Sequence, residues 1–438
     1  MKRSNKKGFT IVELVIVIAV IAILASVLIP TIAGLVRDAN ISADTVLAKE
    51  LNRVLAEEDA KDDASNSDFE AVLKTLRNRG YYIANLNARA DECYFVWDDA
   101  AKQIILVDGR EDYKVLYSNK EVSEKSNWFF AISDPILAAS VEADGYKVKN
   151  TVANVSDLNN TIASADGEVV VYIDESLVID KKNVIVINND AADITIELGE
   201  SNISGNNAST KTKDNVPFRV EKGTLNIKGG TIAASGAFYD ADGDVVSAPV
   251  RSEEGSITNI TNTTFDINTN NGSVMFYGDA NLKDVKIDTN YLGVGAHGNA
   301  QVVLENVEIT STGRCVWATN YNSANGTTHE SGTAKLTIKS GKYTTANQAD
   351  YNGPTYPAIV AYSGDIIIEG GVFENTSNSD LLFQVMESHG SITITGGTFN
   401  GIEFENLTVE ALQAMCVAGA YAHETADGFV INRTAPQA

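Results

Sequence analysis

The sequence predicts a mainly β protein with a long N-terminal α-helix, a small α+β head, a right-handed parallel β-helix and a short C-terminal cap. Three observations predict this fold class. An apolar run with helical spacing opens the chain, and strand-like runs joined by a short turn follow it. A short motif then recurs over roughly residues 165–400. The expected divisions are 1–8 (leader), 9–60 (apolar helix), 61–150 (head and linker), 151–400 (β-helix) and 401–438 (cap).

The first thirty residues have the layout of a membrane anchor. A basic leader ends at Gly8, and residues 14–29 contain no charge and no strong helix breaker. With residues 9–12, this run has about the length that crosses a bilayer as a helix, with the basic leader on the cytoplasmic side. Glu13 places a carboxylate inside the apolar segment, where a charge is costly and needs a partner.

The combination of basic leader, Gly8, Phe9 and Glu13, five places after the glycine, resembles the type IV pilin and pseudopilin family over residues 6–30. The resemblance implies that a prepilin peptidase cuts between Gly8 and Phe9 and methylates the new amine of Phe9. It implies that Glu13 neutralises the N-terminal amine of a neighbouring subunit during filament assembly, since a buried carboxylate is tolerated when it is paired with a cation. Pro30 matches the position of a helix-kinking proline in many family members.

The same resemblance implies a location and a set of partners. Before assembly the chain is expected to lie in the cytoplasmic membrane as a single-pass protein, and after processing in an extracellular filament at the cell surface. Its expected partners are the prepilin peptidase, the membrane and other pilin subunits. The chain has 34 Lys+Arg against 58 Asp+Glu, a net charge of -24, so nucleic acid is not an expected partner.

The cysteine and histidine pattern predicts no metal, no redox site and no cofactor. Cys93, Cys315 and Cys416 are far apart and odd in number, which leaves either one disulfide or unpaired thiols. The four histidines have no metal-ligand spacing.

The apolar helix is expected to continue to about residue 60 and to pack one stripe on the next domain. In the head, Ser67 or Asp68 is expected to cap a second helix that ends at Gly80. Residues 93–97 and 103–107 predict a hairpin, residues 113–117 a further strand, and residues 131–165 a linker with a short helix. The predicted stripe of the long helix consists of Ile32, Leu35, Val36, Val46, Leu47, Leu51, Val54 and Leu55.

Seven copies of a six-residue motif define the repeat region. Each copy opens with Ile or Leu, has a turn-forming residue in third place and ends with Ile, Phe or Tyr. A second apolar pair precedes most copies, so each repeat is expected to be strand, turn, strand, turn, strand and a loop of variable length. Such repeats bury their apolar faces only by stacking. The copies are residues 227–232, 260–265, 282–287, 304–309, 338–343, 368–373 and 394–399.

This pattern favours a parallel β-helix, and its architecture resembles right-handed β-helix proteins of the pectate-lyase-like class. A β-propeller is a distant second choice, because its blades are longer and more uniform. After the last copy, residues 407–416 predict a short amphipathic helix and residues 428–431 a strand, which together form the expected cap.

Enzymatic chemistry on the β-helix has little support in the sequence. Hydrolases of this architecture use clustered Asp with a His-Gly and an Arg-x-Lys, but His297-Gly298 and His389-Gly390 occur where the repeat needs a turn. The run 240–244, with three Asp and one Gly, is better interpreted as a hairpin turn than as a calcium loop. We therefore expect no catalytic residues and no enzyme activity.

Two long loops offer candidate ligand-binding residues. Residues 318–332 and 344–356 are rich in Asn and Tyr, and adjacent coils would place them near Trp317. Aromatic faces beside amide groups suit sugar recognition, although such residues are common in exposed loops. Trp317, Tyr321 and Tyr351 are the candidates for contact with a glycan or another surface ligand.

The sequence thus predicts a type IV pilin-like filament subunit, more plausibly minor than major, that displays a β-helix for adhesion or surface interaction. Two alternatives remain open at this point. One is a glycan-active β-helix enzyme tethered by a pilin-like anchor, and the other is a secretion-system pseudopilin.

Overall fold

The computed structural model divides the chain into two compact units, which are described separately below. The first comprises residues 1–131 and 140–148, and the second comprises residues 132–139 and 149–438. The structure describes residues 11–61, 67–81, 88–132, 135–152, 154–165, 167–173, 176–179, 184–207, 218–236, 248–268, 274–290, 292–322, 327–328, 332–345, 357–375, 382–385, 390–401 and 407–434.

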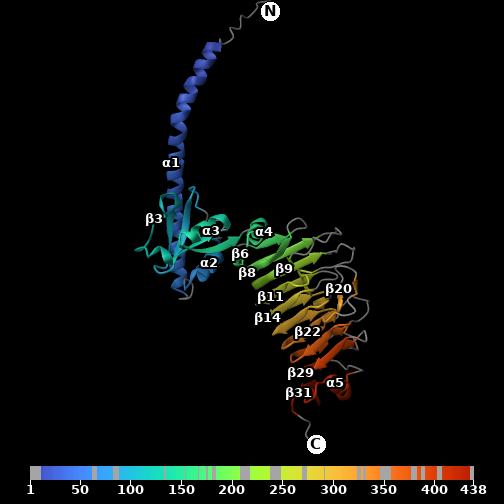
Figure 1. Ribbon diagram of the computed structural model, residues 1–438. Helices are drawn as coiled ribbons and strands as arrows, with labels where there is room; N and C mark the ends of the chain where they lie inside the picture. Colours follow the sequence, from blue (N-terminus) through green and yellow to red (C-terminus); the bar gives the residue numbers. More distant parts are fainter. Residues whose placement is uncertain are drawn as a thin grey trace, which may run out of the picture. The chain divides into compact units, whose positions relative to one another are not determined.

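The first unit is built on α1 (Ile11–Asp59), which projects from a small head (Figure 1). The stripe predicted along this helix is only half correct. Leu51, Val54 and Leu55 are buried, but the earlier members Ile32, Leu35, Val36 and Val46 are exposed. In the described part of the chain, α1 therefore packs on the head from about Arg37 onward, and the large apolar side chains before it are exposed.

The head contains α2 (Phe69–Asn78) and an antiparallel sheet in the order β4-β1-β2-β3, where β4 is Trp128–Ile132, β1 Cys93–Asp98, β2 Gln103–Asp108 and β3 Lys114–Tyr117. The predicted hairpin, third strand and second helix are all present. Asp68 caps α2 by accepting a hydrogen bond from the Ala71 amide at 2.9 Å, and Gly80 has a positive φ of 83° just after it. The sequence did not reveal β4.

The second unit is a stack of coils in which each strand pairs in parallel with the corresponding strand of the next coil, the arrangement expected of a parallel β-helix (Figure 1). Its strands form three sheets. We call them sheets A, B and C. Sheet A contains β10 (Val250–Ser252), β13 (Val274–Phe276), β16 (Leu292–His297), β19 (Arg314–Thr319), β24 (Ile359–Ala361) and β27 (Phe383–Val385).

Sheets B and C hold the two strands of each predicted motif. Sheet B contains β11 (Ile257–Thr261), β14 (Asp279–Lys283), β17 (Gln301–Glu305), β22 (Lys335–Ile338), β25 (Asp365–Ile368) and β28 (Ser391–Ile394). Sheet C contains β12 (Thr264–Asn268), β15 (Lys286–Thr289), β18 (Val307–Ser311), β23 (Gly341–Thr345), β26 (Val372–Asn375) and β29 (Gly397–Gly401).

Earlier coils are less regular. Two long strands, β8 (Ile185–Asn207) and β9 (Phe218–Gly236), run through all three sheets in turn, and β6 (Gly167–Ile173) and β7 (Leu177–Ile179) pair with β8. The strand β5 (Lys147–Val152) pairs with β6. A separate two-stranded sheet joins β20 (Tyr321–Asn322) to β21 (Thr327–Thr328) in the loop after sheet A.

The first and sixth residues of every motif copy point into the core, as predicted. All are at most 1% exposed, from Ile227 and Ile232 in the first copy to Ile394 and Phe399 in the last. In the last three copies the sixth residues form an aromatic stack. The Phe373 ring lies 5.0 Å from the Tyr343 ring and 5.0 Å from the Phe399 ring, at interplanar angles of 13° and 12°.

Helices cover the described coils at both ends. At the C-terminal end are α5 (Val409–Met415) and the hairpin of β30 (Tyr421–Thr425) and β31 (Gly428–Asn432), with β31 antiparallel to β29. This agrees with the expected cap. At the other end, α4 (Val155–Ala163) buries Leu158 and Ile162 in the β-helix core, after α3 (Pro135–Ala143). The predicted linker at residues 131–165 thus contains two helices, one of which belongs to the core.

Candidate functional site

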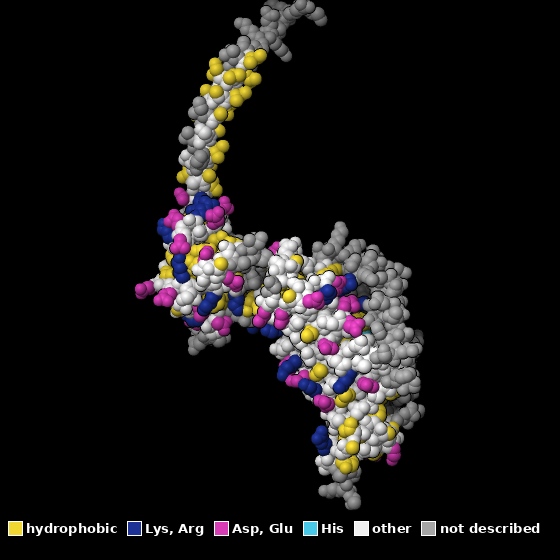
Figure 2. All heavy atoms as spheres, in the orientation of Figure 1, with side chains coloured by type: hydrophobic (Ala, Val, Ile, Leu, Met, Phe, Trp, Pro, Cys, Tyr) yellow, Lys and Arg dark blue, Asp and Glu magenta, His cyan; other side chains and the backbone are white. Residues whose placement is uncertain are grey.

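Among the described residues, the largest group of exposed apolar side chains lies on the first half of α1. Its described large apolar side chains are exposed, for example Ile11 at 82%, Leu24 at 55% and Val36 at 54%. Figure 2 shows hydrophobic side chains along much of this part of the helix. Between residues 14 and 59, α1 is long and apolar enough to cross a membrane. Such a surface indicates a lipid or helical environment, because monomeric soluble proteins rarely expose large apolar patches.

Polar side chains on the second half of α1 attach it to the head. The carboxylate of Asp44, 1% exposed, accepts hydrogen bonds from the backbone amides of Arg89 and Ala90, both at 3.0 Å. The amide of Asn52 donates to the Ile104 carbonyl at 2.7 Å and accepts from the Ile104 amide at 2.8 Å. Asn52 therefore pairs with the backbone of β2 as a neighbouring strand would, which fixes the helix against the sheet.

An ion pair lies where the exposed half of α1 ends. Nη2 of Arg37 is 2.7 Å from Oδ2 of Asp108, and the other oxygen of Asp108 accepts from the Arg110 amide at 3.0 Å. Burial alone would raise the pKa of Asp108, but the hydrogen bonds from Arg37 and from the Arg110 backbone outweigh it, so its pKa lies below the ordinary value. Asp108 is thus held as a carboxylate at neutral pH.

This ion pair predicts that the stability of the head depends on pH. Because folding lowers the pKa of Asp108, its carboxylate stabilises the head fully at pH values above the unfolded-state pKa of about 3.9. This stabilisation is lost as the pH falls through the folded-state pKa. We expect Asp108→Asn to destabilise the head by about 2 kcal/mol at pH 7, with a smaller difference from wild type near pH 3. Hydrogen–deuterium exchange of β2 measures this locally.

The matched control is Asp112→Asn, which changes an exposed carboxylate that faces Lys125 at 3.2 Å. It should alter exchange in β2 little at either pH. Equal effects of the two substitutions would contradict the role assigned to the Arg37–Asp108 pair. The same holds if the difference between Asp108→Asn and the wild type does not become smaller in acid.

The predicted N-terminal site residues lie partly outside the described structure. Gly8 and Phe9, with the expected cleavage and methylation, fall outside the described residues. Glu13 and Pro30 lie within α1, whose helical backbone continues through Pro30, but their side chains are not described. The assembly role of Glu13 and the kink at Pro30 therefore stay predictions.

A membrane-length helix whose exposed apolar half emerges from a small α+β head is the architecture of an N-terminally anchored pilin-like protein. The comparisons agree for this part of the chain. Residues 3–29 match the prokaryotic N-terminal methylation motif. Over 48 residues the chain is 56% identical to the type IV wide pilus major component PilA4 of Thermus thermophilus. The chain thus carries the type IV pilin signature and is homologous to a type IV pilin in its N-terminal segment.

That similarity is limited in extent. It covers 11% of this chain and 34% of PilA4, so the chain spans about a third of the length of the curated relative that it matches. No solved structure matches the chain. The β-helix has no counterpart in these comparisons, and its role must be argued from its own residues.

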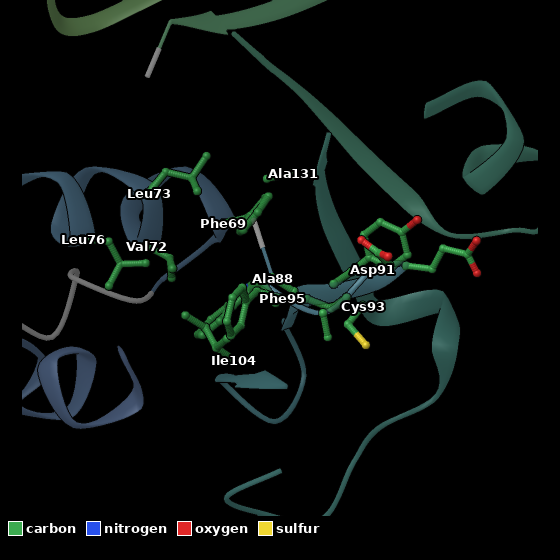
Figure 3. Close-up of a pocket in the computed structure, with 15 residues that line it drawn as sticks. Phe69, Val72, Leu73, Leu76, Ala88, Asp91, Cys93, Phe95, Ile104 and Ala131 are labelled. Atoms are coloured by element: carbon green, nitrogen blue, oxygen red, sulfur yellow. The ribbon is translucent and has the colours of Figure 1, made fainter. Parts of the chain in front are cut away.

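A cavity of about 260 Å³ lies between α2 and the sheet of the head (Figure 3). Phe69, Val72 and Leu73 of α2 line one side of it, and Phe95 and Cys93 of β1 line another. Asp91 and Glu92 also line the cavity, so it combines apolar walls from α2 and β1 with an acidic edge.

On the β-helix, side chains of successive coils contact one another along the outer face of sheet A. The guanidinium of Arg251 lies 4.8 Å from the Tyr277 ring, and that ring lies 4.7 Å from the His297 ring. Nε1 of Trp317 donates to Nε2 of His297 at 3.2 Å. Although the alternation of the strands directs these side chains outward, each is less than 10% exposed.

This arrangement changes the interpretation of two residues. Trp317, predicted to contact a ligand, is 5% exposed and offers little of its ring for stacking in this structure. His297 is not only a turn residue, because it ends β16 and contacts two aromatic rings, whereas Gly298 has the positive φ of 62° that the turn requires. Tyr351 lies outside the described residues, and Tyr321 lies in β20 with its side chain not described.

Thiol and metal chemistry find little support in the described part of the chain. Cys93, Cys315 and Cys416 are all free thiols, and burial raises the pKa of each. A raised pKa keeps a thiol protonated and unreactive. Among the described residues, no group of three or more His, Cys, Asp or Glu is placed to hold a metal ion.

Proposed function

We propose that this chain is a minor, non-catalytic type IV pilin-like subunit that displays its β-helix at the cell surface for adhesion or surface interaction. One observation carries the proposal: the exposed apolar half of α1 coincides with the segment that matches the N-terminal methylation motif. In this proposal α1 first crosses the cytoplasmic membrane and then packs among the helices of other pilin subunits. Prepilin peptidase processing at Gly8 and Phe9 links the two stages.

The size of the second unit supports a minor subunit. The β-helix follows the head in the same chain, so every incorporated copy would bring a complete solenoid into the filament. Although PilA4 is a major component of its pilus, the similarity to it covers only 48 residues, 11% of this chain. A sparse or terminal position in the filament accommodates such a subunit more easily than a position at every step.

The β-helix is proposed as the binding part because its outer surface is rigid, regular and polar. On sheet B, the amide of Asn259 donates to Asn226 at 2.8 Å and the amide of Asn281 donates to Asn259 at 2.9 Å. The visible face carries interspersed acidic and basic side chains, with smaller hydrophobic areas among them (Figure 2). A preformed polar surface of this kind suits a glycan or another hydrated surface ligand.

Leader removal tests the proposal directly. In the native cells, the intact mass and the N-terminal peptide should show loss of residues 1–8 and one added methyl group on Phe9. Gly8→Val should abolish this processing almost completely and keep the chain out of filaments, because the cleavage motif then lacks its glycine. Gly34→Ala is the matched control, since a Cβ at that helical glycine meets no atom within 4 Å.

Each outcome decides between pathways. A retained leader in the wild-type chain, or a cut elsewhere, would refute the pilin assignment and restore the tethered-enzyme alternative. Correct processing without recovery of the chain in sheared filaments would favour the pseudopilin alternative. Normal processing of Gly8→Val would show that the motif is not the cleavage site.

A further inference from the structure

Side-chain amides on successive coils form a ladder across the outer face of sheet B. In β9, Nδ2 of Asn226 donates to Oδ1 of Asp193 in β8 at 2.6 Å. Nδ2 of Asn259 in β11 donates to Oδ1 of Asn226 at 2.8 Å, and Nδ2 of Asn281 in β14 donates to Oδ1 of Asn259 at 2.9 Å. We call these four residues the amide ladder. It joins four coils through one continuous chain of hydrogen bonds.

The ladder uses only part of the hydrogen-bonding capacity of each amide. An asparagine side chain has two N–H donors and an oxygen that accepts up to two hydrogen bonds. Asn259 uses one donor and one acceptor position in the ladder, and Asn281 uses one donor. Asn281 is exposed and Asn259 is partly exposed, and both alternate with buried residues of their strands. Each therefore presents an N–H beside a lone pair on the outer surface, the pattern that pairs with a second amide.

The ladder also orders these amides before any ligand binds. Because each amide is hydrogen-bonded to its neighbour, its side chain loses little freedom on binding. Paired strands lie about 4.8 Å apart, so the amides of Asn226, Asn259 and Asn281 repeat regularly along the axis of the coils. A ligand that matches this array is extended and carries amide groups at regular intervals.

An exposed apolar side chain lies beside the ladder. Ile257 precedes Asn259 by two residues on β11, so both side chains point outward, and Ile257 is 43% exposed. Its partners on the adjacent strands, Thr224 and Asp279, are polar. A ligand group that joins an amide to a small apolar group matches Asn259 and Ile257 together. The acetamido group of an N-acetylated sugar has this composition.

Charged side chains between the ladder and sheet C favour a ligand without net charge. The carboxylate of Glu197 pairs with Lys228 at 2.9 Å. The carboxylate of Glu305 pairs with Lys283 at 2.6 Å and with Lys339 at 3.5 Å. A charged ligand would have to compete with these ion pairs, and an anionic one would also be repelled by a chain of net charge -24. Sugar hydroxyls can instead bond to the exposed lysines without separating the pairs.

We propose that the amide ladder and Ile257 bind a neutral polysaccharide of N-acetylated sugars, which lies along the axis of the coils with its acetamido groups paired to Asn259 and Asn281. This inference rests on the proposed function, because it names the ligand class of the displayed β-helix. It places the ligand on the outer face of sheet B and not at the loops beside Trp317 that the sequence suggested.

Calorimetric titration of the full-length protein in detergent tests the proposal. The probe is the β-1,4-linked hexamer of N-acetylglucosamine, and the control ligand is the glucose hexamer of the same linkage, which has hydroxyls in place of the acetamido groups. We expect saturable binding of the first and binding at least about tenfold weaker of the second. Asn259→Ala should weaken binding of the N-acetylated hexamer about tenfold.

The matched control is Asn290→Ala. Asn290 donates an equivalent inter-coil hydrogen bond to Asn268 at 2.5 Å, but it lies outside the ladder. This variant should bind the hexamer as the wild type does. Ile257→Thr is a second test variant, which keeps a branched β carbon and leaves the ladder hydrogen bonds in place. It should weaken binding about threefold without a change in the urea midpoint of the β-helix.

Three outcomes would overturn the proposal. They are no binding of the N-acetylated hexamer, equal binding of the two hexamers, and equal affinities of Asn259→Ala and Asn290→Ala. If Asn259→Ala does not fold, unchanged binding by Ile257→Thr refutes the proposal in its place. None of these results affects the proposed function, which fails instead if the leader is retained in the native cells, so the two failures are distinguishable.

Discussion

Replacing Phe373 by alanine is expected to lower the free energy of unfolding of the β-helix by about 3–5 kcal/mol. Its ring is fully buried at the centre of the stack formed with Tyr343 and Phe399. The substitution removes two ring contacts at once and leaves a cavity that two neighbouring coils cannot both fill. Urea unfolding followed by far-ultraviolet circular dichroism measures the effect. Because each coil packs only on its neighbours, we expect the C-terminal coils to unfold in a separate, partial transition at lower urea concentration.

Lys342→Ala is the control within the same stack of coils. Lys342 lies on β23, points outward and faces Glu374 at 2.9 Å. An exposed pair of this kind contributes about 0–1 kcal/mol, so the variant should unfold nearly as the wild type does. Similar losses in both variants would mean that the sixth position of the motif does not form the core.

The repeat was predictable because one face of each strand must be apolar. The first and sixth residues of the motif alternate with polar residues, and this alternation alone identified sheets B and C. Sheet A was harder to recognise. The pairs before most copies were identified, but β10 and β16 were missed. In β16 the alternate residues are Gly293 and Gly295, which resemble turn residues in sequence.

The structure gives the reason for those two glycines. A Cβ at Gly293 would lie 2.2 Å from the carbonyl oxygen of Cys315, and one at Gly295 would meet the ring of Trp317. Both positions require glycine because atoms of the next coil lie where a Cβ would be. Local sequence does not contain that information, and neither does it reveal the ring contacts of His297.

The division of α1 was unpredictable for a related reason. Ile32, Leu35 and Leu51 share helical spacing, but only Leu51 is buried in the head. A helix that packs on a domain and one that packs in a membrane or a bundle show the same apolar period. The polar residues were the better guide, since Arg37, Asp44 and Asn52 mark the half of α1 that is bound to the head.

The turn between sheets B and C occurs in three forms, and the sequence indicated only one. In the first copy the third and fourth residues, Gly229 and Gly230, both have a positive φ, of 73° and 66°. In the copies with Asn262, Asp284 and Asn306, the third residue has a positive φ of 51° to 54°, as a turn former in that place predicts. In the last three copies the positive φ moves to the fourth residue, which is Gly341, Gly371 or Gly397. In the copies that contain Asp284 and Asn306, the fourth residue of the motif is a valine. Valine at this position is compatible only with a positive φ at the third residue.

Gly341→Ala should therefore destabilise the β-helix strongly, by about 3 kcal/mol or more. Gly341 has φ of 123°, and a Cβ there would lie 2.0 Å from the carbonyl oxygen of Val307, which belongs to the backbone of the preceding coil. Neither group is at the end of a flexible side chain, so relief requires the two coils to separate. Urea unfolding of the purified chain measures the loss.

Gly255→Ala separates the clash from the backbone strain. Gly255 also has a positive φ, of 85°, but a Cβ there meets nothing within 4 Å. Its substitution should cost about 1–2 kcal/mol from the backbone conformation alone. The excess loss in Gly341→Ala then measures how closely successive coils approach at the turn. Equal losses of stability in the two variants would show that the coils can move apart at this turn. The positive φ at the fourth residue would then not depend on close packing between the coils.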